Sequence, residues 1–277
     1  MTNTFTQKIP SIMGIINITS NSYCSIGRSS ILKEIIKRIE EMISNKVDII
    51  DIGACATNPY TNIISYENEK KYLKPILKYI YNNFSTKIIF SIDTFRWQIA
   101  QMAIDSGFTI INDVSGGNMN KKIFENIKNS NIQFVLMYIK DSIYNVHKHS
   151  ILYKKNYILN DINIYFNNKI LMLKNCGLNK IIIDPGIGFT KNYIFDFEII
   201  SNLNFFQKFN LPIMVGISRK SMINKILQYK PYQNTLNAST IMHMISLFKG
   251  ASILRVHDFK EAMECKNIFL KMLQFKL

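Results

Sequence analysis

Cysteine is scarce in this chain of 277 residues, and its four cysteines, Cys24, Cys55, Cys176 and Cys265, are scattered without a CxxC pair. Structural zinc sites and the disulfide frameworks of small secreted proteins use closely or regularly spaced cysteines. The spacing therefore argues against both kinds of site. It fits a protein of the reducing cytoplasm.

Long apolar segments are also missing. No uninterrupted apolar run approaches the roughly 20 residues that a membrane-spanning helix needs. The first residues, MTNTFTQKIP, contain no apolar core of a signal peptide. Hydrophobic residues nevertheless make up 47% of the chain, which is enough for a substantial core. We therefore expect a folded protein that has no membrane partner.

Acidic residues are few, since 19 Asp and Glu stand against 34 Lys and Arg, for a formal net charge of +15. Such an excess can mark a protein that binds nucleic acid. The lysines, however, are spread along the chain, and no basic cluster or arginine-rich helix occurs. A solvated, lysine-rich surface explains this charge better than a nucleic-acid partner does.

Short apolar runs typical of buried strands recur eight times along the chain. They lie at residues 12–18, 47–53, 87–93, 108–113, 133–138, 180–186, 211–216 and 251–257. Most intervals between them have helical periodicity; in ILKEIIKRIEEMI, one face carries Ile31, Ile35, Ile39 and Met42. Parallel strands need such crossover helices, and strands this apolar suit a sheet covered on both faces. The pattern predicts an α/β protein with a (β/α)8 TIM barrel.

The main alternative is an open, doubly wound sheet. Its dinucleotide-binding fingerprint, GxGxxG after the first strand, is absent, because DPGIGF at 184–189 contains only GxG. No linker or change in composition divides the chain. We therefore expect a single domain over residues 1–277, with a long loop at 139–156 after the fifth strand.

Polar residues recur where the predicted strands end. In a TIM barrel these ends meet at one mouth, which is where catalytic groups lie. The set comprises Asn17, Asp51, Asp93, Asn112, Asp113, Tyr138, Asp184, Ser218, Arg219, Lys220, Arg255 and His257. Each residue alone could be a turn former, since Asn and Asp favour turns. Their recurrence around a closed ring favours a binding site.

Three of these residues, Asp93, Asn112 and Asp184, offer hydrogen-bond acceptors. A carboxylate can accept two parallel bonds from an amino group and a neighbouring ring N–H. Guanine and pterins both present that pair of donors on their pyrimidine edge. The acceptors therefore favour a polar heterocycle of this kind as the ligand.

A second set, Lys220, Arg255 and His257, is cationic or seeks anions. Barrels often bind phosphate after strands seven and eight, where Arg255 and His257 lie. Asn17 adds a neutral oxygen, and Mg²⁺ commonly takes one or two protein oxygens together with phosphate and water. The implied ligand is a heterocycle that carries a phosphate group.

Seven motifs, in order along nearly the whole chain, resemble those of the dihydropteroate synthase family. They are MGIINITSNSY, DIGACATNP, SIDT, INDVSGG, DPGIGF, GISRKS and RVHD. The resemblance implies a Mg²⁺-dependent transferase of folate biosynthesis. Its reaction would join 6-hydroxymethyl-7,8-dihydropterin diphosphate and 4-aminobenzoate to give 7,8-dihydropteroate and diphosphate. The resemblance also implies a homodimer.

For the pterin, the resemblance implies that Asp184 and Asn112 hold the pyrimidine edge and that Asp93 bonds elsewhere on the ring. Lys220 would lie over the pterin and border the aminobenzoate pocket. Ser221, at a helix start, would face the aminobenzoate carboxylate, in keeping with the affinity of helix N-termini for anions.

For the leaving group, the resemblance implies that Thr57, Arg255 and His257 hold the diphosphate and that Asn17 holds Mg²⁺. Lys220, Arg255 and His257 are then the predicted catalytic residues. No covalent intermediate on the enzyme is needed, so no cysteine or serine is predicted to act as a nucleophile.

The segments after the first, second and fifth predicted strands depart from the family pattern. Residues 20–27 read SNSYCSIG where the family usually has Pro-Asp-Ser-Phe-Ser-Asp-Gly-Gly, Asn58 stands at a usual arginine, and Tyr138 at a usual histidine. These changes keep open a pterin-binding barrel with weak or no turnover. A methyltetrahydrofolate-dependent methyltransferase is a further alternative, since its barrel also binds pterins. GISRKS and RVHD favour the synthase, because a methyl transfer has no diphosphate to hold.

Overall fold

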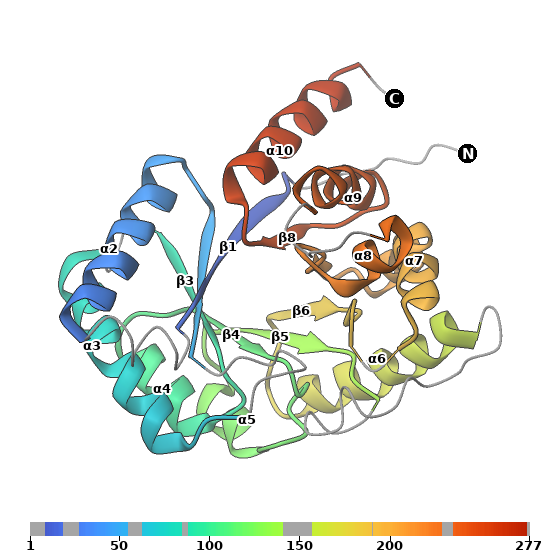
Figure 1. Cartoon of the computed structure of the whole chain (residues 1–277). Coiled ribbons are helices and arrows are strands. Elements are labelled where there is room, and N and C mark those ends of the chain that lie inside the picture. Colours follow the sequence, from blue (N-terminus) through green and yellow to red (C-terminus); the bar gives the residue numbers. More distant parts are fainter. Residues whose placement is uncertain are drawn as a thin grey trace.

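The computed structural model describes residues 9–18, 28–54, 63–84, 88–140, 157–189, 191–228 and 235–275. Within these ranges each of the eight predicted apolar runs coincides with one strand, and β1 begins one residue before its run (Figure 1). The strands are β1 (Ser11–Asn17), β2 (Ile49–Gly53), β3 (Ile89–Asp93), β4 (Ile110–Asp113), β5 (Gln133–Met137), β6 (Ile181–Asp184), β7 (Met214–Val215) and β8 (Ile253–Val256).

The strands form one parallel sheet in the order β6-β5-β4-β3-β2-β1-β8-β7. The seam of this sheet lies between β6 and β7. There Ile183 pairs in parallel with Ile213, and the N–H of Ile183 donates to the carbonyl of Pro212 at 2.9 Å. The sheet thus curls into a nearly closed barrel, which confirms the predicted TIM-barrel fold.

Helices cover the outside of the barrel (Figure 1). They are α2 (Arg28–Ser44), α3 (Tyr66–Phe84), α4 (Trp97–Asp105), α5 (Lys122–Ile127), α6 (Tyr157–Asn175), α7 (Tyr193–Ser201), the 3-10 helix η1 (Leu203–Phe209), α8 (Ser221–Leu227), α9 (Leu236–Phe248) and α10 (Phe259–Leu273). The predicted apolar face of α2 is buried, with exposures of at most 8%. Among the described residues, no helix is both long and apolar enough to cross a membrane.

The crossovers are less uniform than the sequence pattern suggests. Between β7 and β8 the chain forms two helices, α8 and α9. Of the predicted loop at 139–156, residues 139–140 have no regular structure and the remainder lies outside the described residues.

Side chains along the strands alternate between the barrel interior and the helix layer. At the amino end, the interior holds an apolar cluster of its own: Met13, Ile49, Ile110, Val135, Ile182, Met214 and Ile253. Two residues further along, the same faces of four strands carry Asp51, Asn112, Asp184 and Arg255. An apolar floor therefore supports a polar layer at the carboxyl end of the barrel.

Candidate functional site

Asp51, the third residue of β2, is fully buried at the centre of this polar layer. Its Oδ2 accepts hydrogen bonds from Arg255 Nε at 2.7 Å and from Asn112 Nδ2 at 3.0 Å. Arg255 also donates from Nη2 to Asp93 Oδ2 at 2.7 Å. A single network therefore joins side chains from β2, β3, β4 and β8.

Asp51 is not among the residues that the sequence predicts to bind substrate. The run VDIIDIG nevertheless held a signal that Asp51 has a partner. A carboxylate inside a buried strand is costly unless it is paired. That cost implies a buried cation, but only the fold identifies it as Arg255, 204 positions away. Within the described part of the chain, Asp51 Oδ1 is buried and has no hydrogen-bond partner.

Burial raises the pKa of two carboxyl groups at the carboxyl end of the barrel, Asp93 and Asp184. The pKa of Asp93 rises to about 7 because of burial, against the opposing field of Arg255. Burial also raises the pKa of Asp184, while the N–H of Gly186 and the charges of Lys220 and Arg255 act in the other direction. The layer is thus buried and rich in acceptors, which suits a ligand that brings N–H donors.

Asp184 ends β6 and starts the DPGIGF turn. Its Oδ1 accepts from the N–H of Gly186 at 2.8 Å, which closes an Asx turn. Gly186 and Gly188 have φ values of 68° and 79°, a region that glycine enters without strain. A Cβ atom on Gly188 would lie 2.8 Å from Lys220 Cδ. The turn fixes the direction of the carboxylate and leaves room for a lysine beside it.

Lys220 directly precedes α8 and has extended backbone angles, φ −75° and ψ 145°. Its Nζ lies 4.1 Å from the centroid of the Phe189 ring. Burial, followed by the charge of Arg255, lowers the pKa of Lys220 to about 8. Ser221 is the first residue of α8 and is exposed. Lys220 therefore connects the Asp184 turn with the start of this helix.

An open cavity of about 280 Å³ lies beside the ends of β1 and β8. It is lined by Ile15, Ile16, Asn17, Glu34, Ile35, Arg38, Arg219 and His257. Burial, followed by the charges of Arg255 and Arg219, lowers the pKa of His257 to about 4. His257 is therefore a neutral imidazole at neutral pH, and the positive charge of this cavity comes from Arg38 and Arg219.

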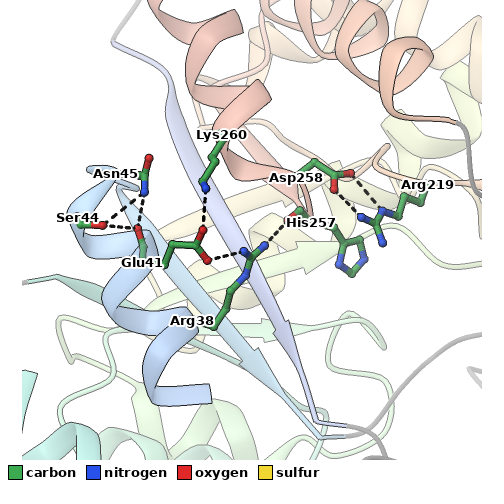
Figure 2. A network of polar contacts seen from close by, with 8 residues as sticks. All are labelled: Arg38, Glu41, Ser44, Asn45, Arg219, His257, Asp258 and Lys260. Carbon is green, nitrogen blue, oxygen red and sulfur yellow. Dashed lines mark hydrogen bonds and ion pairs between the residues drawn. The ribbon is translucent and has the colours of Figure 1, made fainter. Parts of the chain in front are cut away.

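The backbone of His257 is held from two sides. Its N–H donates to Ser218 Oγ at 3.3 Å, and its carbonyl accepts from Arg38 Nη2 at 3.1 Å. Glu41 in turn binds Arg38 Nη1 at 2.9 Å and Lys260 Nζ at 2.8 Å (Figure 2). These contacts tie the end of β8 to α2 and α10.

Arg219 forms a second, more exposed ion pair at the cavity. Its Nε and Nη2 donate to the two carboxylate oxygens of Asp258, at 3.2 and 2.5 Å. Figure 2 shows Arg38 and Arg219 on opposite sides of His257. The cavity is thus flanked by two guanidinium groups, which match the geometry of phosphate oxygens.

Asn17 is the predicted metal ligand, and it is the exposed last residue of β1 in this cavity. In the part of the chain that the structure describes, no cluster of three or more His, Cys, Asp or Glu side chains could hold a metal ion. Mg²⁺ usually takes few protein oxygens and completes its shell with substrate phosphates and water. A single neutral oxygen beside two arginines fits an ion that binds together with a diphosphate.

The fold brings most of the predicted site residues to one mouth. Asp93, Asn112 and Arg255 meet through Asp51, while Asp184 lies in the field of Lys220 and Arg255. Asn17 and His257 line the adjoining cavity. Thr57 and Asn58 lie outside the described residues, as does segment 20–27.

Comparison with known proteins agrees with this geometry. Residues 13–257 match the family model described as pterin binding enzyme. The dihydropteroate synthase of Clostridium beijerinckii is 34% identical over 253 residues, which cover 90% of this chain and 89% of that protein. The Escherichia coli dihydropteroate synthase is 30% identical over 261 residues, which cover 94% of this chain and 90% of that protein.

Two solved structures are similar along almost their whole length. Dihydropteroate synthase from Clostridium difficile, determined in the presence of pteroic acid, has a TM-score of 0.86 and 28% identity and covers 96% of this chain and 97% of its own. Yersinia pestis dihydropteroate synthase with a sulfonamide drug complex has a TM-score of 0.87 and 28% identity, with coverages of 98% and 96%.

Proposed function

This chain belongs to the dihydropteroate synthase family of pterin-binding enzymes, and we propose that it uses Mg²⁺ to join 6-hydroxymethyl-7,8-dihydropterin diphosphate to 4-aminobenzoate. The products are 7,8-dihydropteroate and diphosphate, so the protein is a transferase of folate biosynthesis. One observation carries the proposal. A buried layer of hydrogen-bonded acids and amides and a cavity that two arginines flank lie at the same, carboxyl end of the barrel strands.

The pterin half of the substrate binds over the polar layer. Asp184 and Asn112 accept from the amino and ring N–H groups of the pyrimidine edge, and Asp93 bonds elsewhere on the ring. Burial of these side chains strengthens such bonds, because few water molecules compete for them. Asp51 and Arg255 contribute by fixing Asn112 and Asp93 in place.

The diphosphate half binds in the neighbouring cavity, beside Arg38, Arg219 and His257. Bound through Asn17 and the diphosphate, Mg²⁺ would supply Lewis-acid stabilisation of the leaving group. Arg38 and Arg219 add fixed positive charge, which stabilises the negative charge that develops on the departing oxygen. The family resemblance of the sequence also implies that Thr57 binds the diphosphate.

During transfer, the bond between the pterin methylene carbon and the diphosphate oxygen breaks, and the aminobenzoate nitrogen bonds to that carbon and loses a proton. The positive charge that develops on the methylene spreads into the pterin ring, where Asp93 and Asp184 offset it. Lys220 and Phe189 form one wall of the aminobenzoate pocket, and Ser221 faces its carboxylate. Fixing both substrates in line removes much of the entropic barrier.

The proposal includes a homodimer in a reducing cytoplasm, without a nucleic-acid or membrane partner. The scattered cysteines support the reducing compartment, since Cys265 is a buried free thiol and Cys176 an exposed one. Size-exclusion chromatography coupled to light scattering measures the oligomeric state. A mass equal to that of one chain would contradict the homodimer.

The decisive test is an assay of purified protein with pterin diphosphate, labelled aminobenzoate and Mg²⁺. We expect slow, Mg²⁺-dependent formation of labelled dihydropteroate that stops when the metal is chelated. Replacing the arginine of the family by Asn58 removes one charge-assisted contact, which costs about 1.5–3 kcal/mol. Asn58→Arg should therefore raise kcat/KM roughly ten- to a hundredfold.

Asn58→Gln is the matched control, because it changes the size of the side chain without adding charge, and its kcat/KM should stay near that of the wild type. Pterin affinity should change little in either variant. If neither the wild type nor Asn58→Arg forms product, the synthase proposal fails and a pterin-binding barrel without turnover takes its place.

A further inference from the structure

The loop of residues 185–189 carries two parts of the site. At its start, the Asp184 carboxylate is aimed by the N–H of Gly186. At its end, Phe189 packs against the ammonium group of Lys220. A Cβ atom on Gly186 would collide with the carbonyl oxygen of Tyr138, so the loop lies directly on the end of β5. Its shape decides how Asp184 and Phe189 face the mouth of the barrel.

Two buried side chains of opposite charge hold this loop. Lys191 is only 9% exposed, and its Nζ donates to the carbonyl oxygens of Gly186 at 2.5 Å and Phe189 at 2.9 Å. Asp196, in the first turn of α7, is 2% exposed, and its Oδ1 accepts from the N–H of Gly188 at 3.0 Å. Two charged side chains therefore hold the backbone of the loop at Gly186, Gly188 and Phe189.

Burying these charges is costly, because Lys and Asp are almost never fully buried unless they are paired. Burial lowers the pKa of Lys191 and raises that of Asp196, and each residue opposes the shift of the other. Burial raises the pKa of Asp184, while the N–H of Gly186, then the charges of Lys220 and Arg255, and last that of Lys191 act to lower it. A neutral donor could hold two carbonyls at lower cost, so the charge of Lys191 has a second role to fill.

Tyr138 provides a favourable setting for that charge. Its ring lies 5.3 Å from Lys191 Nζ, and the negative face of an aromatic ring attracts a cation. Its hydroxyl donates to Asp161 Oδ2 at 2.7 Å, which keeps the ring in place. A tyrosine side chain cannot become a cation, whereas the histidine usual in the family at this position can, and it would compete with Lys191.

We propose that Lys191 is a positioning residue for the transfer reaction: it holds the 185–189 loop together with Asp196, and it places a buried positive charge against the turn that aims the Asp184 carboxylate. The inference deepens the proposed function and rests on it, because it takes a pterin as the ligand of Asp184. Lys191 acts through Asp184 and Phe189, without touching the substrate itself.

The test is calorimetric titration with 6-hydroxymethylpterin across the acidic to neutral pH range. Binding needs the carboxylate form of Asp184, so affinity falls when the pH drops through the pKa of that group. Asp93, whose pKa burial raises to about 7, titrates in the same site, and Lys220 and Arg255 also act on Asp184, so the readout is the difference between each variant and the wild type. Lys191→Met removes a nearby positive charge, so this fall should begin at a higher pH than in the wild type. Lys191→Arg keeps the charge and the donors and should retain the wild-type profile.

Asp196→Asn gives the opposite expectation, and it keeps the proposal testable even if Lys191→Met does not fold. Removing this negative charge leaves Lys191 unopposed, so the loss of pterin binding should move to lower pH. A purely structural clamp would weaken binding in both variants at every pH. Lys180→Met is the matched control. Lys180 directly precedes β6, is exposed, and donates a hydrogen bond to Asn131. Its profile should match the wild type.

Two outcomes would overturn the role of Lys191. One is a Lys191→Met profile identical to that of the wild type. The other is a loss of pterin affinity in Lys191→Met that is equal at every pH and that also occurs in Lys191→Arg. A wild-type protein that binds no pterin would instead contradict the proposed function, so the two failures can be told apart.

Discussion

The barrel mouth has two unlike sides. On the side of β2, β3 and β4, a polar network is buried: Arg255 joins Asp51 to Asp93, and Asn112 donates to Asp51, whose side chain is fully buried. On the side of β1, β8 and α2, ion pairs of similar length surround an open cavity, and the Arg219 side chain is 60% exposed (Figure 2). Similar contacts differ in consequence, because water and salt screen the second set and hardly reach the first.

This difference suits a substrate with two unlike halves. A planar heterocycle is recognised through fixed directions, which buried side chains with few alternatives can provide. A flexible, highly charged diphosphate needs concentrated charge that can rearrange around it, which exposed guanidinium groups provide. In the proposed function, the buried side therefore supports specificity, and the exposed side supports binding and departure of the leaving group.

The largest expected effect comes from breaking the buried side at its centre. Asp51→Ala leaves Arg255 and Asn112 without their shared acceptor, so the free energy of unfolding should fall by about 3–5 kcal/mol. Urea denaturation followed by circular dichroism measures it, with the milder Asp51→Asn as a second variant. Asp258→Ala breaks the exposed pair with Arg219 and should cost at most about 1 kcal/mol. Equal losses in the two alanine variants would remove the distinction between the two sides.

A smaller effect should sharpen the role of the Asp184 carboxylate. Asp184→Asn can still accept from the N–H of Gly186, so the turn should survive. The amide N–H of the new side chain would, however, face an N–H donor of the pterin. Pterin binding should therefore weaken by about 2–4 kcal/mol in calorimetric titration. Asp105→Asn, at an exposed position of α4, is the control and should bind normally. Unchanged affinity in Asp184→Asn would exclude Asp184 from the pterin site.

The smallest effect is expected on the exposed side. Arg38→Gln removes one partly exposed cation from the cavity, so the affinity for inorganic diphosphate with Mg²⁺ should fall roughly two- to fivefold at low salt. The difference from wild type should shrink as salt is added. Lys37→Gln removes the same charge from an exposed position of α2 that does not line the cavity. A loss of equal size in Lys37→Gln would point to the overall charge of the protein instead.

Much of the fold could be read from local patterns. The runs from IMGIINI to ASILRVH predict strands because their apolar residues are consecutive, and the spacing of Ile31, Ile35, Ile39 and Met42 predicts the buried face of α2. Asp184 beside Pro185 and Gly186 likewise predicts a turn at a strand end. These features depend on neighbours along the chain, so the sequence by itself determined them.

Only the tertiary structure decided which side chains meet. Asp51 and Arg255 are 204 positions apart, and their contact depends on how β1 aligns with both β2 and β8. The contact between Arg38 and the carbonyl of His257, and the position of Lys191 against the 185–189 loop, arise in the same way. The physical reason is that the barrel closes cooperatively. The register of all eight strands together sets the distances between these side chains, and no local sequence pattern encodes that register.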